Sequence, residues 1–125
     1  MLMRWPALCL QLSLVACGGK DAPANAGTPS DCEGAAAAAR ERVVAVARAN
    51  VSCTSDADCT RMDARASCFD ACSWPVNQTG KGAVDRANTI VEAAECKAFN
   101  HAGCQLVVPP CAPPQPAVCA EGTCR

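Results

Sequence analysis

Cysteine limits the fold of this sequence more than any other residue type, because twelve of the 125 residues are cysteines. A short chain in which about one residue in ten is cysteine is typical of a secreted domain held by disulfides. The aromatic share is only 3%, so a core made mostly of alanine and valine needs additional covalent constraints. In a reducing compartment the same cysteines would indicate metal binding instead, and the N-terminus decides between these interpretations.

The N-terminus has the pattern of an export signal. Arg4 precedes a mostly apolar run, residues 5–16, which is shorter than the roughly 20 residues that span a bilayer. The following segment, Leu14-Val15-Ala16-Cys17, resembles the lipobox of bacterial lipoproteins. That resemblance implies that residues 1–16 are a signal peptide. It also implies that Cys17 is the lipidation site, carrying acyl chains such as palmitate.

The same resemblance implies a location. A chain lipidated at Cys17 is anchored to a membrane of the cell envelope. Gly18, rather than an aspartate, follows the cysteine, which resembles the sorting of lipoproteins to the outer membrane. Residues 1–17 are also compatible with an ordinary signal peptide cleaved elsewhere, or with a cytosolic chain that has an apolar start.

The count of the remaining cysteines agrees with disulfide formation. Cys9 leaves with the signal peptide and Cys17 takes the lipid, so ten cysteines remain. An even number can pair completely, and we predict about five disulfides whose connectivity stays open. The predicted disulfide-forming residues are Cys32, Cys53, Cys59, Cys68, Cys72, Cys96, Cys104, Cys111, Cys119 and Cys124.

Two helices are predicted in a domain that spans residues 32–125 and follows a lipidated flexible linker, residues 17–31. Ser30 and Glu33 form a capping-box pattern, and residues 33–50 are rich in helix formers. Their apolar side is predicted to contain Cys32 together with Ala36, Ala39, Val43, Val46 and Ala47.

The second helix is predicted over residues 83–99, where the apolar positions share one side. Cys96 does not lie on that side. Either the helix is regular and Cys96 joins a separate segment, or its last turn is distorted. The predicted apolar side consists of Val84, Ala87, Ile90, Val91, Ala94 and Ala98.

The other segments have weaker patterns. Residues 51–79 are predicted to form short strands or turns, with a loop after Trp74 because of Pro75 and Asn77. Residues 105–108 have the composition of a short strand, and residues 109–116 are proline-rich and extended. Residues 117–124 are predicted to form a hairpin with Gly122 in its turn. The fold class is therefore small disulfide-rich α+β, with two helices, short strands and irregular loops.

No catalytic, cofactor-binding or metal site is predicted. The three residues between Cys68 and Cys72 make a wider spacing than the common two-residue zinc knuckle, and His101 is the single histidine. A zinc site of four cysteines is conceivable, but disulfides are favoured after export. A calcium loop starting at Asp56 fails because Arg61 and Ser67 occupy its sixth and twelfth positions. Asp56 and Asp58 are predicted to form Asx-turns instead.

These patterns predict a function class rather than a reaction. The arrangement C-x-x-D-x-D-C, C-x₃-C, a helix and C-x₄-C, over residues 53–124, resembles uncharacterised cysteine-rich lipoproteins of Gram-negative bacteria. We predict a non-enzymatic binding or structural module that contacts the membrane through its lipid and has an envelope or extracellular protein as partner. Without Arg4 the chain has ten basic and twelve acidic side chains, which argues against a nucleic-acid partner.

Two alternatives to this function are kept. The first is a small inhibitor or toxin-like domain that uses residues 109–116 as a disulfide-braced loop. The second is an enzyme of the envelope, which a well-formed polar pocket would favour. The proline-rich residues 109–116 are the best candidate for a partner surface, because a preformed extended segment loses less entropy on binding; the same residues are also compatible with a rigid connector.

Overall fold

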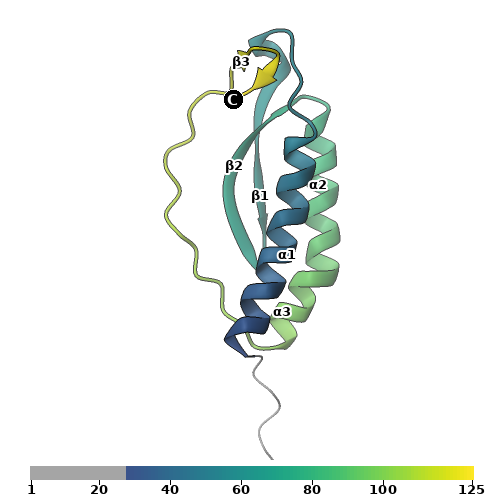
Figure 1. Ribbon diagram of the computed structural model, residues 1–125, viewed down its shortest axis with the longest axis vertical. Coiled ribbons are helices and arrows are strands. Elements are labelled where there is room, and N and C mark those ends of the chain that lie inside the picture. Colours follow the sequence, from purple (N-terminus) through teal and green to yellow (C-terminus); the bar gives the residue numbers. More distant parts are fainter. Residues whose placement is uncertain (1–27) are drawn as a thin grey trace, which may run out of the picture.

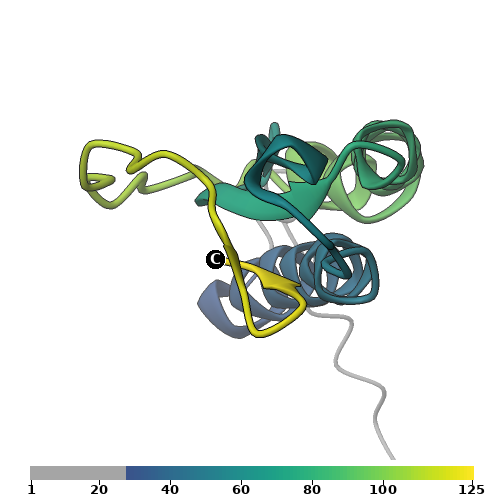
Figure 2. The same ribbon diagram turned by 90° about the horizontal axis from the view of Figure 1, so that it is seen from above.

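The computed structural model describes residues 28–125, so the predicted signal peptide, Cys17 and linker residues 17–27 lie outside the described residues. In the described part, a long helix, α1 (Pro29–Arg48), lies antiparallel beside a second helical segment. A two-stranded hairpin packs lengthwise against this helix pair, with its strands running along the helices (Figure 1). The view from above shows the two layers and an irregular segment that extends away from them (Figure 2). The predicted small disulfide-rich α+β fold is confirmed.

Helix α1 begins earlier than predicted. Its N-cap is Thr28, whose side chain accepts from the Asp31 backbone N–H, while the Asp31 carboxylate accepts from the Thr28 N–H. The capping box is therefore Thr28–Asp31, and the prediction of Ser30 with Glu33 was wrong. The reason is Pro29, which is well suited to the first helical position because its missing N–H is not needed there.

The strands expected within residues 51–79 are present, and they are longer and more regularly paired than predicted. Strands β1 (Cys59–Ala66) and β2 (Phe69–Asn77) form one long antiparallel pair, with an irregularity between Asp63 and Arg65. The predicted loop after Trp74 was wrong, because Pro75 lies within β2 opposite Arg61. A two-stranded sheet consists of edge strands only, and an edge strand tolerates proline where its N–H would face outward.

The second helical segment explains the position of Cys96. It consists of α2 (Gly80–Val91), a π-helical turn η2 (Glu92–Cys96) and α3 (Lys97–His101). A π-turn adds one residue per turn, which rotates the following residues relative to a regular helix. Cys96 and Phe99 are consequently buried, and Val91, just before the turn, is buried as predicted. Ile90 lies in the regular helix α2 at the edge of the predicted apolar side, and its 53% exposure is a separate error of the prediction. The distorted last turn was therefore the correct alternative, and Ala94 and Ala98 are also exposed.

The core lies between the helix pair and the inner face of the hairpin. It is small-residue rich, as the composition indicated, and it contains two phenylalanine rings and one disulfide. Trp74 packs against it from β2. The buried cluster consists of Ala39, Val43, Ala47, Ala64, Cys68, Phe69, Val76, Val84, Ala87, Val91, Cys96 and Phe99.

All ten predicted cysteines lie within the described residues and are paired in five disulfides. Four of the five fasten the C-terminal residues 104–125 to earlier parts of the chain, and the fifth crosses the core. The pairs are Cys32–Cys104, Cys53–Cys119, Cys59–Cys124, Cys68–Cys96 and Cys72–Cys111.

The C-terminal hairpin is confirmed. Strands β3 (Cys119–Ala120) and β4 (Thr123–Cys124) are joined by Glu121 and Gly122, which both have positive φ. This pattern matches the mirror-image turns that two-residue hairpins favour. The predicted short strand at residues 105–108 is absent, because the described residues 105–118 contain no regular secondary structure.

Candidate functional site

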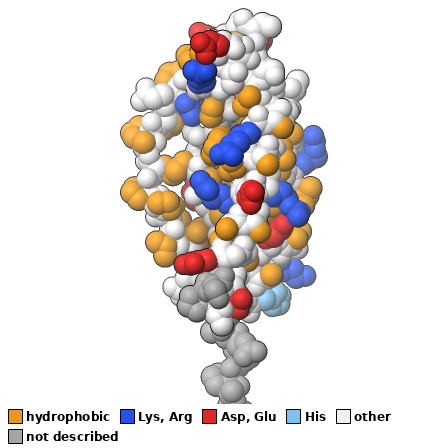
Figure 3. Space-filling view, in the orientation of Figure 1, with side chains coloured by type: hydrophobic (Ala, Val, Ile, Leu, Met, Phe, Trp, Pro, Cys, Tyr) orange, Lys and Arg blue, Asp and Glu red, His pale blue; other side chains and the backbone are white. Residues whose placement is uncertain are grey.

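The most unusual surface of the molecule is the irregular segment 105–118, which we name the strap. It runs along one side of the domain from the end of α3 to the C-terminal hairpin (Figure 1). No Asp, Glu, Lys, Arg or His occurs between His101 and Glu121. Val107 is 86% exposed and Val108 is 54% exposed, and apolar side chains gather along this edge in the space-filling view (Figure 3). An exposed, uncharged and apolar surface of this kind makes the strap the candidate interaction site of the described residues.

Covalent bonds hold the strap near both ends and at its middle. Cys32–Cys104 precedes the strap, Cys53–Cys119 follows it, and Cys111 joins it to Cys72 of β2. Arg61 adds a polar fastening, because its Nε donates to the Gln115 carbonyl. A segment held in this way has already lost much of its conformational entropy. The further loss of entropy when it binds a partner is therefore smaller.

The Cys53–Cys119 and Cys59–Cys124 bridges hold the C-terminal hairpin against residues 51–59. The two closely spaced cysteine pairs of the sequence, Cys53 with Cys59 and Cys119 with Cys124, are thus bonded to each other and not within each pair. Backbone bonds support this contact, since the Cys124 N–H donates to the Val51 carbonyl at 2.7 Å. The Asp56 Oδ1 accepts from the Cys119 N–H at 2.7 Å. Asp56 is therefore a fastening for the end of the strap and does not form the predicted Asx-turn.

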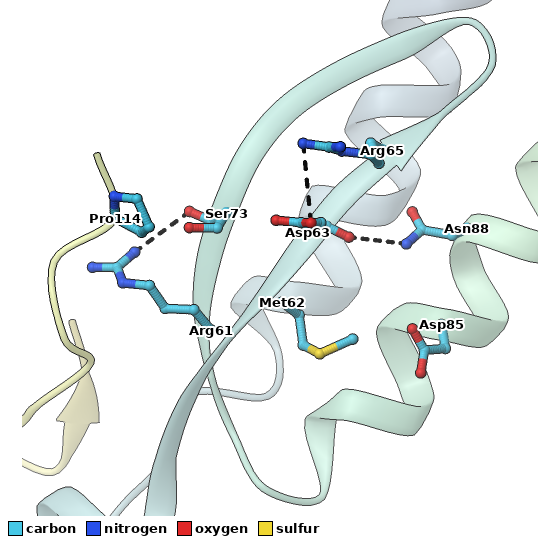
Figure 4. Close-up of a pocket in the computed structure, with 8 residues that line it drawn as sticks. All are labelled: Arg61, Met62, Asp63, Arg65, Ser73, Asp85, Asn88 and Pro114. Carbon is cyan, nitrogen blue, oxygen red and sulfur yellow. Dashed lines mark hydrogen bonds and ion pairs between the residues drawn. The ribbon is translucent and has the colours of Figure 1, made fainter. Parts of the chain in front are cut away.

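A cavity of about 510 Å³, lined by both polar and apolar side chains, lies beside the strap around the edge of β1 (Figure 4). Arg61 turns toward the strap residue Pro114, and its NH1 lies 3.4 Å from the Ser73 carbonyl. On the other side, the Asn88 amide donates to the Asp63 carbonyl at 3.0 Å. The lining residues include no histidine and no thiol; they are Arg61, Met62, Asp63, Arg65, Ser73, Asp85, Asn88 and Pro114.

A second cavity, about 460 Å³, lies where the strap leaves the helices. Phe99 from α3 and Leu106 and Val107 from the strap give it an apolar lining, and the Cys32–Cys104 bridge forms one wall. Val107, the more exposed of the two strap valines, therefore borders a hollow in the domain surface.

The single histidine and the residues around the start of α2 lie at helix ends. His101 is exposed at the end of α3. Asn77 Oδ1 accepts from the Gly80 N–H and the Thr79 hydroxyl, both at 2.8 Å, so this asparagine caps the start of α2. A Cβ at Gly80 would lie 2.7 Å from Asn50 Cβ, and only glycine fits this close approach.

Two carboxylates stabilise turns. Asp58 Oδ2 accepts from the Thr54 N–H and hydroxyl and from the Ser55 N–H. These donors precede Asp58 in the chain, as in a capping box, so the predicted Asx-turn at Asp58 was wrong. The hydrogen bonds from Thr54, followed by that from Ser55, lower the pKa of Asp58 below its ordinary value of 3.8. Hydrogen bonding from Ser67 lowers the pKa of Glu92 below 4.5 in the same way.

Both shifts predict a loss of stability in acid. A carboxyl whose pKa is lowered in the folded state stabilises the fold above its unfolded pKa, and this contribution disappears as the pH falls through the folded value. We expect Glu92→Gln to be less stable than the original chain at pH 7, with the difference shrinking below pH 4.5. Urea unfolding between pH 2 and pH 7 measures this, and a constant difference would contradict it.

The sites predicted from the sequence are distributed as follows. Cys17 lies outside the described residues, and the ten other cysteines are disulfide-bonded. Sequence reasoning singled out residues 109–116 but missed Arg61 and the charge-free character of the whole segment. None of the helices within residues 28–125 combines the length and the apolar character that spanning a bilayer requires.

Comparison with known proteins gives no relative for this chain. No protein-family model matches its sequence, no curated protein matches it, and no solved structure matches its fold. The function of the chain therefore has to be inferred from its own residues.

Proposed function

We propose that this chain is a lipid-anchored, extracytoplasmic binding module without enzymatic activity, which uses the strap to bind a partner protein of the cell envelope. The observation that carries this proposal is the strap itself. It is uncharged, exposed, and fastened by disulfides before, within and after its length. Five disulfides support an oxidising compartment, and the lipobox-like residues before Cys17 support export and anchoring.

The chemistry of the strap favours a particular kind of partner surface. Pro110 and Pro113 form a P-x-x-P pattern, and Pro114 and Pro116 follow. Proline rings hold φ near −65° and remove backbone donors, so the segment presents carbonyl oxygens and apolar rings. Grooves lined by aromatic side chains bind such segments. The partner is therefore expected to offer an aromatic groove with few charges.

The anchor predicts a large change on substitution of Cys17. In the native host, Cys17→Ser should abolish incorporation of a labelled palmitate analogue and leave the signal peptide uncleaved, because lipidation precedes cleavage in proteins of the resembling class. The intact mass of the protein reports lipidation and cleavage of the signal peptide. Fractionation of the membranes, with the outer membrane separated, reports where the protein is anchored. Cys9→Ser serves as the matched control and should change neither result. Incorporation of label into the Cys17→Ser chain would overturn the anchoring part of the proposal.

The binding part is tested by photo-crosslinking in cells. A photoreactive residue at Val107 or Pro114 should give a discrete adduct with an envelope protein, and the same residue at Arg40 of α1 should not. Adducts from all three positions, or from none, would contradict binding through the strap.

The structure favours one second candidate, a protease inhibitor, because inhibitors also present a braced and exposed loop. A panel of purified proteases separates the two functions. Stoichiometric inhibition that is lost after changes in the strap would support the inhibitor, and absence of inhibition throughout the panel would exclude it for those proteases.

A further inference from the structure

One disulfide differs from the other four in its exposure. Cys111 is exposed on the strap and its partner Cys72 is half-buried, whereas every other half-cystine is buried or half-buried. Cys68–Cys96, by contrast, is fully buried in the core. Access decides which disulfide a thiol attacks first. Cys72–Cys111 is therefore the bridge most open to reduction.

A nearly buried carboxylate lies against this bridge. The Asp70 side chain is only 11% exposed, and its Oδ2 is 3.4 Å from Arg65 NH2. The other oxygen, Oδ1, accepts from the Cys72 N–H at 2.8 Å and lies 4.0 Å from Cys111 Sγ. Arg65 thus orients the carboxylate so that one oxygen faces the two sulfur atoms.

The backbone at this point departs from the hairpin ladder. Asp63 pairs with Ser73 and Arg65 pairs with Asp70, which leaves Cys72 outside the register. Cys72 has φ +59°, a conformation uncommon for a residue with a side chain. Irregular positions of this kind in a strand re-aim side chains and are frequent beside functional sites.

We propose that Cys72, Cys111 and Asp70 form a redox-gated site for a thiophilic divalent cation, for which Zn²⁺ is the probe. A dithiol reductant supplies two electrons and two protons, becomes a disulfide itself, and leaves Cys72 and Cys111 as thiols. Binding of Zn²⁺ then displaces the two thiol protons, and Asp70 Oδ1 provides a third ligand. Water takes the fourth position of the tetrahedron.

The charges and distances suit this assignment. Two thiolates and one carboxylate are balanced by the cation together with Arg65, which keeps its ion pair to Asp70. Zinc–sulfur bonds of about 2.3 Å and zinc–oxygen bonds of about 2.1 Å place ligand atoms roughly 3.5–3.8 Å apart in a tetrahedron. The oxygen and Cys111 Sγ are already 4.0 Å apart. After reduction, the two sulfurs need to separate, which the irregular strap permits at Cys111.

Two measurements on the purified, oxidised protein test the proposal. Limited dithiothreitol treatment followed by alkylation and peptide mass analysis should label Cys72 and Cys111 first, with the other eight cysteines still paired. The reduced protein should then bind one Zn²⁺ by calorimetry, while the oxidised protein binds none.

Variants separate the site from adventitious binding. Asp70→Asn should leave the order of alkylation unchanged and weaken Zn²⁺ binding at least tenfold. Asp85→Asn, a carboxylate elsewhere on the surface, should leave the affinity unchanged. Cys72→Ser with Cys111→Ser should abolish binding. Alkylation of another bridge first, failure of the reduced protein to bind zinc, or equal affinity in Asp70→Asn would each overturn the site. The order of alkylation and Zn²⁺ binding by the reduced protein are both measured on the unchanged sequence. These two results can therefore overturn the proposal even if a variant fails to fold.

Discussion

Replacing Cys68 and Cys96 together by alanine is expected to lower the free energy of unfolding by about 3–5 kcal/mol, near the upper end for removal of a native disulfide from a small domain. Two effects add. The unfolded chain regains the entropy that the bridge removed, and the side chains, which are fully buried, leave unfilled space between the hairpin turn and η2. Urea unfolding of the oxidised protein measures this loss.

Serine at the same two positions provides the matched control. Cys68→Ser with Cys96→Ser removes the same bridge but leaves hydroxyl groups in the core, where each unsatisfied group costs about 1–3 kcal/mol more. The serine pair should therefore be less stable than the alanine pair. If the free energy of unfolding fell by less than about 1 kcal/mol in both double variants, the bridge would be only a minor constraint. That result would contradict the role expected from its burial in the core.

The second large effect is expected at the end of the π-distorted helix. Phe99→Ala should cost about 3–5 kcal/mol, because the ring is buried among the core residues and its loss leaves a cavity. Ile90→Ala is the comparison, since Ile90 is more than half exposed. It should cost less than about 1 kcal/mol.

This pair of variants also tests the helix geometry directly. A regular α-helix over residues 83–99 would turn Phe99 away from the side that contains Val84, Ala87 and Val91. Thermal unfolding of both variants decides between the two geometries. A loss for Phe99→Ala no larger than the loss for the exposed Ile90→Ala would contradict the π-helical turn at Glu92–Cys96.

The helices were predictable because their apolar residues recur with the helical period. Ala39, Val43 and Ala47 are buried as predicted. The failure after Val91 has a local cause, since a π-turn shifts every later residue and leaves no signature in composition. Cys96 gave the one hint, because a cysteine predicted to form a bridge lay off the apolar side.

The length and the pairing of the hairpin strands were missed for a different reason. In β1, Arg61, Asp63 and Arg65 alternate with Met62, Ala64 and Ala66, which is the pattern of a half-buried strand. Alanine contributes little hydrophobicity, so the alternation is faint. The prediction also gave Pro75 too much weight as a breaker, because a strand of a two-stranded sheet is always an edge strand.

The candidate site was predictable only in part. The prolines of residues 109–116 indicated the strap. The even number of cysteines after Cys17 indicated the number of disulfides. The connectivity, in contrast, joins residues up to 72 positions apart, and only the packed fold brings such residues together. For the same reason, the approach of Asp70 to Cys72 and Cys111 has no counterpart in local sequence patterns.

The disulfide pattern has a consequence for how such a chain matures. When a polypeptide emerges from a translocation channel N-terminus first, Cys53, Cys59 and Cys72 arrive before their partners. Four of the five bridges require Cys104 or a later residue, so only Cys68–Cys96 can close before then. The early thiols either wait unpaired or form wrong pairs that must be exchanged. For a chain exported as we propose, this order of arrival predicts that efficient maturation requires a thiol–disulfide isomerase.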